Sequence, residues 1–373
     1  MKRLIGLGLA VGVSLSLVAA QRLNSLGIVY NAADKMDQSF NQRAFEGANR
    51  ASMSYNIGLL EYAPRDPDKI EAGVRELSAA GMSLVIGVGF SSEPAVTKVA
   101  KEFPQTKYAV LDSVPTGANT LGLVFREEEG SYVVGYVAGR STSTGVLGFV
   151  GGMNIPLIHK FELGYTAGVK AACPTCTVLA EYIGSDKDPS AWNNPTKATE
   201  ITAKFAKQGA DIVYAAAGGS GGGVIDYVKK AKCVRGSSLP KNLKFRVTNI
   251  SASIPKEAVY SKTCGSNSRP MFFIGVDSNQ NYLGDNDATP RTMNYVLTSM
   301  EKRLDNVVYK LLTELNTGGT WKSGVRDFGL REEGVGFAVD QYNKTLISKE
   351  TLTQVGRIKA DIIAGKIKIP KTK

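Results

Sequence analysis

The feature that most restricts the fold of this chain is a regular alternation of short apolar runs with amphipathic segments. Residues 26–30, 57–62, 83–90, 108–112 and 121–125 form runs typical of strands. The intervening segments 39–55, 67–80 and 93–103 repeat their apolar residues with the period of a helix. Strands separated by helical crossovers pair in parallel, so this part of the chain predicts a parallel sheet with helices on both faces.

The same alternation begins again further along the chain. Strand-like runs at 145–150, 176–184, 211–217 and 271–277 are separated by helical segments at 157–172, 195–207 and 223–232. A chain of 373 residues is also longer than one hydrophobic core usually supports. We therefore expect an α/β protein with two Rossmann-like lobes, a hinge and an interlobe cleft.

The order of these elements predicts how the lobes divide the chain. We assign residues 21–125 and 279–322 to the first lobe, and residues 126–278 and 323–373 to the second. Residues 234–269 are rich in Ser, Lys and Pro and are expected to form an insertion on the second lobe. Hinge segments are expected near 125–127, near 277–278 and just before 335.

Residues 1–20 have the pattern of a cleaved signal peptide. Lys2 and Arg3 precede a short apolar run, and Ala19 and Ala20 are small side chains at the cleavage position. No later stretch is long and apolar enough to cross a bilayer, so the protein is not expected to span the membrane.

Export affects how the four cysteines are interpreted, because disulfides persist outside the cytoplasm. The CxxC pair Cys173 and Cys176 could be a structural disulfide, a redox-active dithiol or half of a metal site; we favour the disulfide. A zinc site would need two more nearby ligands, and the only histidine is His159. Cys233 and Cys264 bracket the insertion and are expected to bond to each other.

The net charge of +11 raises the question of nucleic-acid binding. The basic residues are scattered apart from a basic tail at 357–373, which favours an ordinary basic surface. We therefore expect no nucleic-acid partner.

Enzyme classes that use similar folds fit less well. The first strand is followed by NAADKMDQSFN, which lacks the glycine fingerprint of nucleotide-dependent oxidoreductases. Nucleoside hydrolysis would need a metal cluster rich in aspartate, which the sequence does not suggest. A repressor of this fold would begin with a helix-turn-helix, where this chain has its signal-like segment. We expect a binding protein with no enzymatic activity, no cofactor and no metal.

Several motifs together resemble one family. They are MDQSFNQRAFEG (36–47), FREEEGSYVVGYVAG (125–139), GFVGGMNIPLIHKFELGYTAGVKA (148–171), AAAGGSGGGV (216–224), FIGVDSNQ (273–280) and VLTSMEKRLDNVVY (296–309). Over 26–340 the chain resembles the basic membrane protein family of substrate-binding proteins, which includes bacterial purine-nucleoside receptors. The resemblance implies a type I periplasmic-binding-protein fold with three interlobe crossings. It also implies a monomer that delivers guanosine, inosine or adenosine to an ABC transporter permease. A sugar or autoinducer receptor of the same fold is the alternative.

The resemblance further implies which residues bind the ligand. Phe40 and Tyr214 would stack on opposite faces of the base, with Trp192 as a third aromatic side chain. Asp277 would accept hydrogen bonds from ribose hydroxyls, and Lys302 would donate to them and neutralise Asp277. The implied site also includes Asn31, Asn41, Asp112, Gly218 and Gly219.

Structural alternatives stay open for several of these residues. Tyr214 could be a core residue of its strand, and Asp277 could cap a helix. Phe40 could pack against the helix that it begins, for which Ser39 and Gln42 predict a capping box.

The chain departs from the family pattern at two positions. The nucleoside receptors carry an aspartate just after the first strand, where this chain has Asn31, so the preferred base stays open. Many members are lipoproteins with a cysteine at the cleavage site, but position 21 is Gln21. We therefore expect a periplasmic protein without a lipid anchor.

Overall fold

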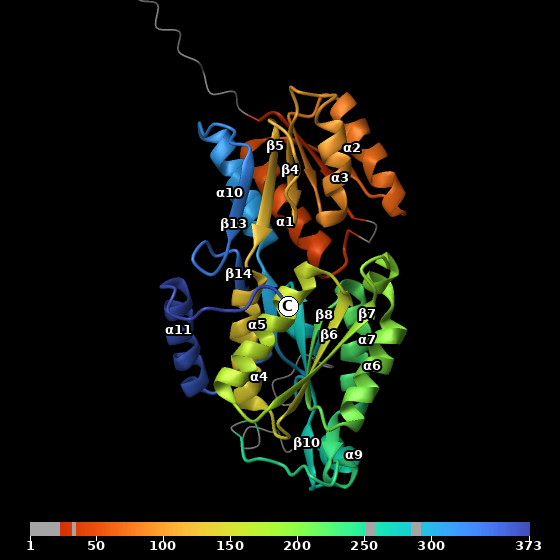
Figure 1. Ribbon diagram of the computed structural model, residues 1–373, viewed down its shortest axis with the longest axis vertical. Coiled ribbons are helices and arrows are strands. Elements are labelled where there is room, and N and C mark those ends of the chain that lie inside the picture. Colours follow the sequence, from red (N-terminus) through yellow and green to blue (C-terminus); the bar gives the residue numbers. More distant parts are fainter. Residues whose placement is uncertain (1–22, 32–34, 249, 251–257, 285–291) are drawn as a thin grey trace, which may run out of the picture.

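The computed structural model describes residues 23–31, 35–248, 250, 258–284 and 292–373. Two lobes lie one above the other, and each contains a six-stranded sheet (Figure 1). The predicted two-lobed α/β architecture is therefore confirmed. The expected signal peptide at 1–20 lies outside the described residues.

The first lobe is built on an all-parallel sheet with the order β13-β5-β4-β3-β1-β2. Side chains alternate between the faces of a strand. In β3, Leu84 and Ile86 accordingly share a core cluster with helix α1, whereas Val85 shares a cluster with α2 and α3. The elements are β1 (Ser25–Val29), α1 (Phe40–Tyr55), β2 (Gly58–Tyr62), α2 (Ile70–Ala79), β3 (Leu84–Gly87), α3 (Glu93–Val99), β4 (Lys107–Leu111), β5 (Thr120–Phe125), α10 (Leu304–Asn316) and β13 (Gly324–Phe328).

The second lobe has the order β14-β12-β11-β8-β6-β7, in which only β14 runs antiparallel to its neighbour. Helices α4 and α5 lie on one side of this sheet and α6 and α7 on the other (Figure 1). The elements are α4 (Glu127–Ser141), β6 (Val146–Met153), α5 (Pro156–Ala172), β7 (Thr177–Gly184), α6 (Pro195–Lys207), β8 (Ile212–Ala216), α7 (Gly221–Ala231), β11 (Phe272–Asp277), β12 (Val296–Lys302), β14 (Val335–Phe337) and α11 (Lys349–Ile363).

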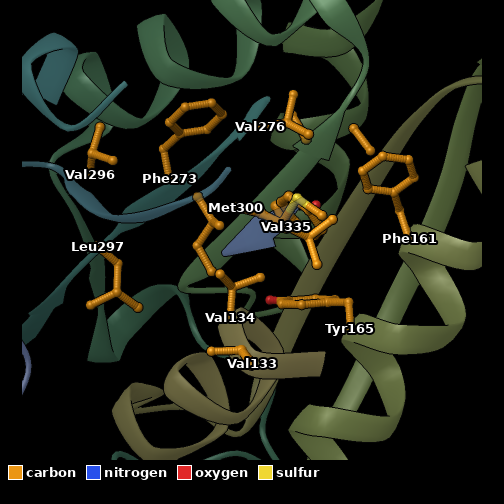
Figure 2. Packing of buried hydrophobic residues seen from close by; sticks show 14 of the residues in the cluster. Val133, Val134, Phe161, Tyr165, Phe273, Val276, Val296, Leu297, Met300 and Val335 are labelled. Atoms are coloured by element: carbon orange, nitrogen blue, oxygen red, sulfur yellow. The ribbon is translucent and has the colours of Figure 1, made fainter. Parts of the chain in front are cut away.

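The core of the second lobe fills the space between α4, α5 and the sheet. Figure 2 shows apolar side chains from these elements pointing toward one another, among them Val134 of α4, Tyr165 of α5 and Met300 of β12. All three are buried. This packing fixes α4 and α5 relative to β12, whose last residue, Lys302, belongs to the site described below.

The structure corrects the expected lobe boundaries. The expectation placed 279–322 in the first lobe, but β12 (Val296–Lys302) pairs within the second sheet. It also placed 323–373 in the second lobe, but β13 (Gly324–Phe328) pairs with β5 in the first. The chain therefore crosses between lobes after Lys302 and not at 277–278, as had been expected. The expected crossings at 125–127 and before 335 agree with the structure.

The insertion and the cysteines lie in the second lobe. A two-stranded antiparallel sheet, β9 (Cys233–Arg235) with β10 (Ser268–Pro270), and helix α9 (Ala258–Cys264) stand at the end far from the first lobe (Figure 1). Both expected disulfides are present, with Cα atoms 5.4 Å apart in Cys173–Cys176 and 6.1 Å apart in Cys233–Cys264.

Short 3₁₀ segments complete the described part of the chain. They are η1 (Pro67–Lys69), η2 (Phe90–Ser92), η3 (Pro189–Asn193), η4 (Gly218–Ser220), η5 (Gly236–Ser238) and η6 (Asn281–Gly284). Among the described helices, none has the length and apolar character needed to cross a membrane.

Candidate functional site

A buried ammonium group lies where the lobes meet. Lys302 ends β12, and its side chain is only 1% exposed. Its Nζ lies 2.6 Å from a carboxylate oxygen of Asp112, which follows β4 in the first lobe. It also lies 2.9 Å from Oε1 of Glu127, the first residue of α4. The aromatic ring centroids of Phe125, Phe40 and Phe161 surround this ammonium at 4.9, 5.3 and 5.6 Å.

The carboxylates keep this ammonium charged. Burial alone would lower the pKa of Lys302, but Asp112, Glu127 and Asp277 outweigh that effect and raise its pKa. Burial raises the pKa of Asp112 to about 6, because Lys302 opposes the shift only in part and Glu127 adds to it. The cluster thus combines a firmly protonated donor with acidic acceptors.

Asp277 is the third acidic group of the site. It ends β11, is buried, and accepts a hydrogen bond of 2.9 Å from Oγ of Ser39 in the first lobe. Burial raises the pKa of Asp277 to about 7, against the opposing effects of Lys302 and Ser39. Further hydroxyl donors would favour its charged form, because hydrogen bonds to a carboxylate stabilise that form.

Asp112 and Asp277 share an unusual backbone conformation. Their φ angles are +70° and +63°, in the left-handed region that residues other than glycine seldom adopt. Such strain is typical of functional sites, where the surrounding structure holds it in place. Asp112 follows β4 and Asp277 ends β11, so both lie at carboxyl ends of strands, which is where open α/β sheets bind ligands.

The start of helix α1 differs from the expected capping box. The carboxylate of Asp37 accepts hydrogen bonds from the backbone N–H groups of Ser39 (2.8 Å), Asn41 (2.9 Å) and Gln42 (3.2 Å). Asp37 therefore caps the helix, and Ser39 makes no capping hydrogen bond with its side chain. Its hydroxyl group instead binds Asp277 across the interface.

Further hydrogen bonds join the lobes beside this contact. The Ser278 hydroxyl donates to the backbone oxygen of Ser39 at 3.0 Å, and the Gln280 amide donates to that of Gln38 at 3.1 Å. The lobes are thus in direct contact around Asp277.

Aromatic side chains from both lobes lie near the polar cluster. Phe40 is half-buried, and a Cβ atom built on Gly89 would be 3.7 Å from its ring and 3.5 Å from the Asn31 amide nitrogen. The adjacent Phe90 has its ring centroid 6.3 Å from that of Trp192, which belongs to the second lobe. Phe40, Phe90 and Trp192 are therefore aromatic groups at the interface.

Two asparagines and a glycine turn extend this region. Asn41 is buried and donates from Nδ2 to Oδ1 of Asn31 at 2.8 Å. In the second lobe, a Cβ atom on Gly218 or Gly219 would lie 3.5 or 3.3 Å from the backbone oxygen of Trp192. The predicted residues of this region therefore lie at or beside the interface; they are Asn31, Asn41, Trp192, Gly218 and Gly219.

Trp192 is held in place by the strand beneath it. A Cβ atom on Gly152 of β6 would lie only 2.4 Å from the Trp192 ring, so this position needs glycine. The indole N–H also points at the sulfur of Met153, 3.1 Å away.

Tyr214 is the predicted site residue that the structure places elsewhere. It is fully buried in the second lobe, with ring centroids 5.1 Å from Tyr165 and 5.6 Å from Phe149. Its hydroxyl group lies 3.3 Å from that of Ser131. These contacts support the role of a core strand residue in place of the expected stacking role.

Sequence reasoning missed the parts played by Glu127, Ser39 and Phe90. Glu127 belongs to a run of three glutamates at a helix start, where acids are common because of the helix dipole. The sequence did contain an indication that Glu127 is buried. The rest of α4 is apolar on nearly every side, which is typical of a buried helix, and its first turn is buried with it.

The fold and the site define a class. Two parallel-sheet lobes, joined by three crossings and with polar and aromatic side chains gathered between them, are the features of two-lobed solute-binding proteins. The chain is similar to the solute-binding protein of an ABC transporter system from Aeropyrum pernix K1, with a TM-score of 0.71, 23% identity and 94% of each chain covered. It is also similar to one from Conexibacter woesei, with a TM-score of 0.65, 18% identity, and 94% and 99% covered.

The family model described as "ABC transporter substrate-binding protein PnrA-like" matches residues 26–235 and 249–373. The chain belongs to this family, which confirms the resemblance noted from its motifs.

Named relatives agree with the family assignment. The chain is 28% identical over 349 residues to the "ABC transporter nucleoside-binding protein BmpA" of Lactococcus lactis subsp. cremoris, covering 92% of this chain and 88% of that one. It is 29% identical over 342 residues to the "CD4+ T-cell-stimulating antigen" of Listeria monocytogenes, covering 90% and 85%. It is 26% identical over 342 residues to "Basic membrane protein A" of Borreliella burgdorferi, covering 90% and 85%.

Proposed function

We propose that this ABC transporter substrate-binding protein captures a nucleoside between its lobes and presents it to the permease of an importer. The proposed ligand carries a purine base, as in guanosine, inosine or adenosine. The main support for this proposal is that a buried carboxylate–ammonium cluster and aromatic side chains from both lobes lie together at the interface. The name of the Lactococcus relative, a nucleoside-binding protein, supports it.

The polar cluster suits the pentose. Asp277 can accept hydrogen bonds from two vicinal hydroxyl groups, and Lys302 can donate to the same hydroxyls. Hydrogen bonds to ionised groups are stronger than those between neutral groups, so this pair favours a ligand rich in hydroxyls. Asp277 already accepts a hydrogen bond of 2.9 Å from the Ser39 hydroxyl group, so its carboxylate is oriented to accept from hydroxyl donors.

The aromatic side chains suit the base. Phe40 is proposed to stack on one face of the heterocycle, with Trp192 or Phe90 near the other. Stacking of a base on an aromatic side chain contributes about 1–3 kcal/mol. Asn31 and Asn41, which carry both donors and acceptors, are proposed to read the edge of the base.

We infer a cycle of binding and release without chemistry. The lobes would close around the nucleoside by a hinge motion, as in other periplasmic binding proteins, and the permease would recognise the closed form. We further propose that the protein works as a monomer in the periplasm.

A free sugar or a sugar-like autoinducer is the second candidate ligand, because the carboxylate–ammonium cluster would also suit a pentose without a base. A thermal-shift screen separates the two candidates. Purine nucleosides are expected to raise the midpoint of unfolding, whereas free purine bases, ribose and nucleoside monophosphates are expected to raise it little. A shift with sugars but with no nucleoside would overturn the proposal.

A further inference from the structure

Glu127 lies between two ammonium groups at the hinge. Its side chain is fully buried, and its Oε1 is 2.9 Å from Nζ of Lys302. Its Oε2 is 3.1 Å from Nζ of Lys160 on helix α5. The same Lys160 amine also donates to the backbone oxygen of Phe125 at 3.3 Å. This carboxylate is thus held by partners at both of its oxygens.

The pair between Glu127 and Lys302 connects two crossings of the chain between the lobes. Glu127 comes two residues after the end of β5, where the chain enters the second lobe. Lys302 is the last residue of β12, where the chain leaves it again. Both residues therefore lie on the second-lobe side of the hinge, whereas Asp112, the other partner of Lys302, lies in the first lobe.

This placement has a consequence for lobe opening. In the proposed cycle, Asp112 would move away with the first lobe when the lobes separate. Glu127 and Asp277 belong to the second lobe and would stay near Lys302, and of these two it is Glu127 that forms an ion pair with its ammonium, at 2.9 Å. A buried ammonium without a paired carboxylate is costly, and the Phe125 and Phe161 rings supply no charge to pair with it. Glu127 can therefore keep Lys302 charged and oriented in a form that has not yet bound ligand.

We propose that Glu127 is a positioning residue for nucleoside binding. It holds the Lys302 ammonium at the place where the ribose hydroxyls arrive, so less ordering remains to be done when the ligand binds. The proposal rests on the proposed function, since it assigns a role in the same site. Glu127 itself need not touch the ligand.

The neighbouring Glu128 provides a matched control. It is nearly as buried, at 1% exposure, and it lies in the same helical turn. Its carboxylate pairs with Lys371 at 3.1 Å and not with Lys302. Glu127→Gln and Glu128→Gln thus each remove one buried carboxylate charge, but only the first removes an ion-pair partner of Lys302.

The test measures the affinity of a purine nucleoside by calorimetry for wild type, Glu127→Gln, Glu128→Gln, Lys302→Met and the Glu127→Gln/Lys302→Met double variant. Glu127→Gln is expected to weaken binding about tenfold or more, since it removes a charge-assisted contact of the binding ammonium. Glu128→Gln is expected to stay within about twofold of wild type. In the Lys302→Met background, Glu127→Gln is expected to have no further effect, because its role acts through Lys302.

The remaining outcomes separate a failure of the positioning role of Glu127 from a failure of the proposed function. Equal losses in Glu127→Gln and Glu128→Gln, or a full further loss in the double variant, would overturn the positioning role while leaving the proposed function in place. If wild type binds no nucleoside, the proposed function fails first and the positioning role fails with it. Should Glu127→Gln not fold, Glu127→Asp keeps the charge but shortens its reach, and affinity equal to wild type in that variant would also count against the role.

Discussion

Replacing Phe40 by alanine tests the stacking half of the proposed site. Phe40 begins α1 at the interface of the lobes, and its ring centroid lies 5.3 Å from Nζ of Lys302. The residue is only partly buried, so part of its surface is exposed. Truncation to alanine would remove a flat apolar surface beside the polar cluster without removing any of its charges.

The expected magnitude follows from the geometry. Base stacking on an aromatic side chain is worth about 1–3 kcal/mol, which corresponds to a loss of about 5- to 150-fold in nucleoside affinity. The cost in folding stability should fall below the ~3–5 kcal/mol typical of a buried Phe→Ala change, because the ring is partly exposed. The Lys302 ammonium also loses one of its surrounding rings, and a cation–π contact is worth about 2 kcal/mol when the cation is desolvated, as this buried ammonium is.

Isothermal calorimetry with a purine nucleoside measures the effect, and Phe45→Ala is the control. Phe45 lies on the same helix and is likewise half-buried, but its ring packs under Nζ of Lys35 at 4.3 Å. Phe45→Ala should leave nucleoside affinity within about twofold of wild type. Equal affinities in Phe40→Ala and wild type, with both proteins folded, would refute the stacking role.

Three further predictions concern charge, fluorescence and the disulfide. Asp277→Asn should abolish most nucleoside binding and yet stabilise the ligand-free protein above pH 7 by up to about 4 kcal/mol. Burial raises the pKa of Asp277 from 3.8 to about 7, so the stability linked to its protonation is present below pH 3.8 and is lost as pH rises through 7. Denaturant unfolding of wild type and Asp277→Asn at pH 4.5 and 8 measures the difference in their unfolding free energies. A difference of the same size at both pH values would contradict the prediction. Trp192 is one of two tryptophans, so a nucleoside should change the intrinsic fluorescence of wild type and of Trp321→Phe but not that of Trp192→Phe. Replacing Cys233 and Cys264 by alanine should lower the unfolding free energy by about 3–4 kcal/mol, because the disulfide closes a loop with a sequence separation of 31. Nucleoside affinity should stay unchanged, and a large loss of affinity would contradict the placement of this disulfide far from the site.

Most of the fold could be predicted from local patterns. The apolar runs and helical segments recur along the chain, and the structure contains the strands and helices that they indicate. The failures lie in the last part of the chain, where β12 and β13 exchange lobes relative to the expectation. Strand GVRDF of β13 is largely exposed and charged, so it lacks the apolar pattern of a buried strand. Its lobe is decided by pairing with β5, a contact made across about 200 residues of sequence that no local pattern encodes.

The candidate site residues came from the family resemblance and not from local pattern, and their role in ligand binding stays a prediction. Asp112, Asp277 and Lys302 come together at the interface because each ends or follows a strand there. Tyr214 could not be placed from sequence, because side chains alternate along a strand and a shift of one residue moves a ring from the interface to the core. Ser39 was expected to cap its own helix, but Asp37 performs that role with three backbone contacts.

A crystal structure of the protein with saturating guanosine, inosine or adenosine would show how the ligand lies between the lobes. We expect the nucleoside between the lobes, with ribose hydroxyls within hydrogen-bond distance of the Asp277 carboxylate and the Lys302 ammonium and with the base against the Phe40 ring. A nucleoside bound elsewhere, or one bound between the lobes with its ribose away from both Asp277 and Lys302, would contradict this expectation.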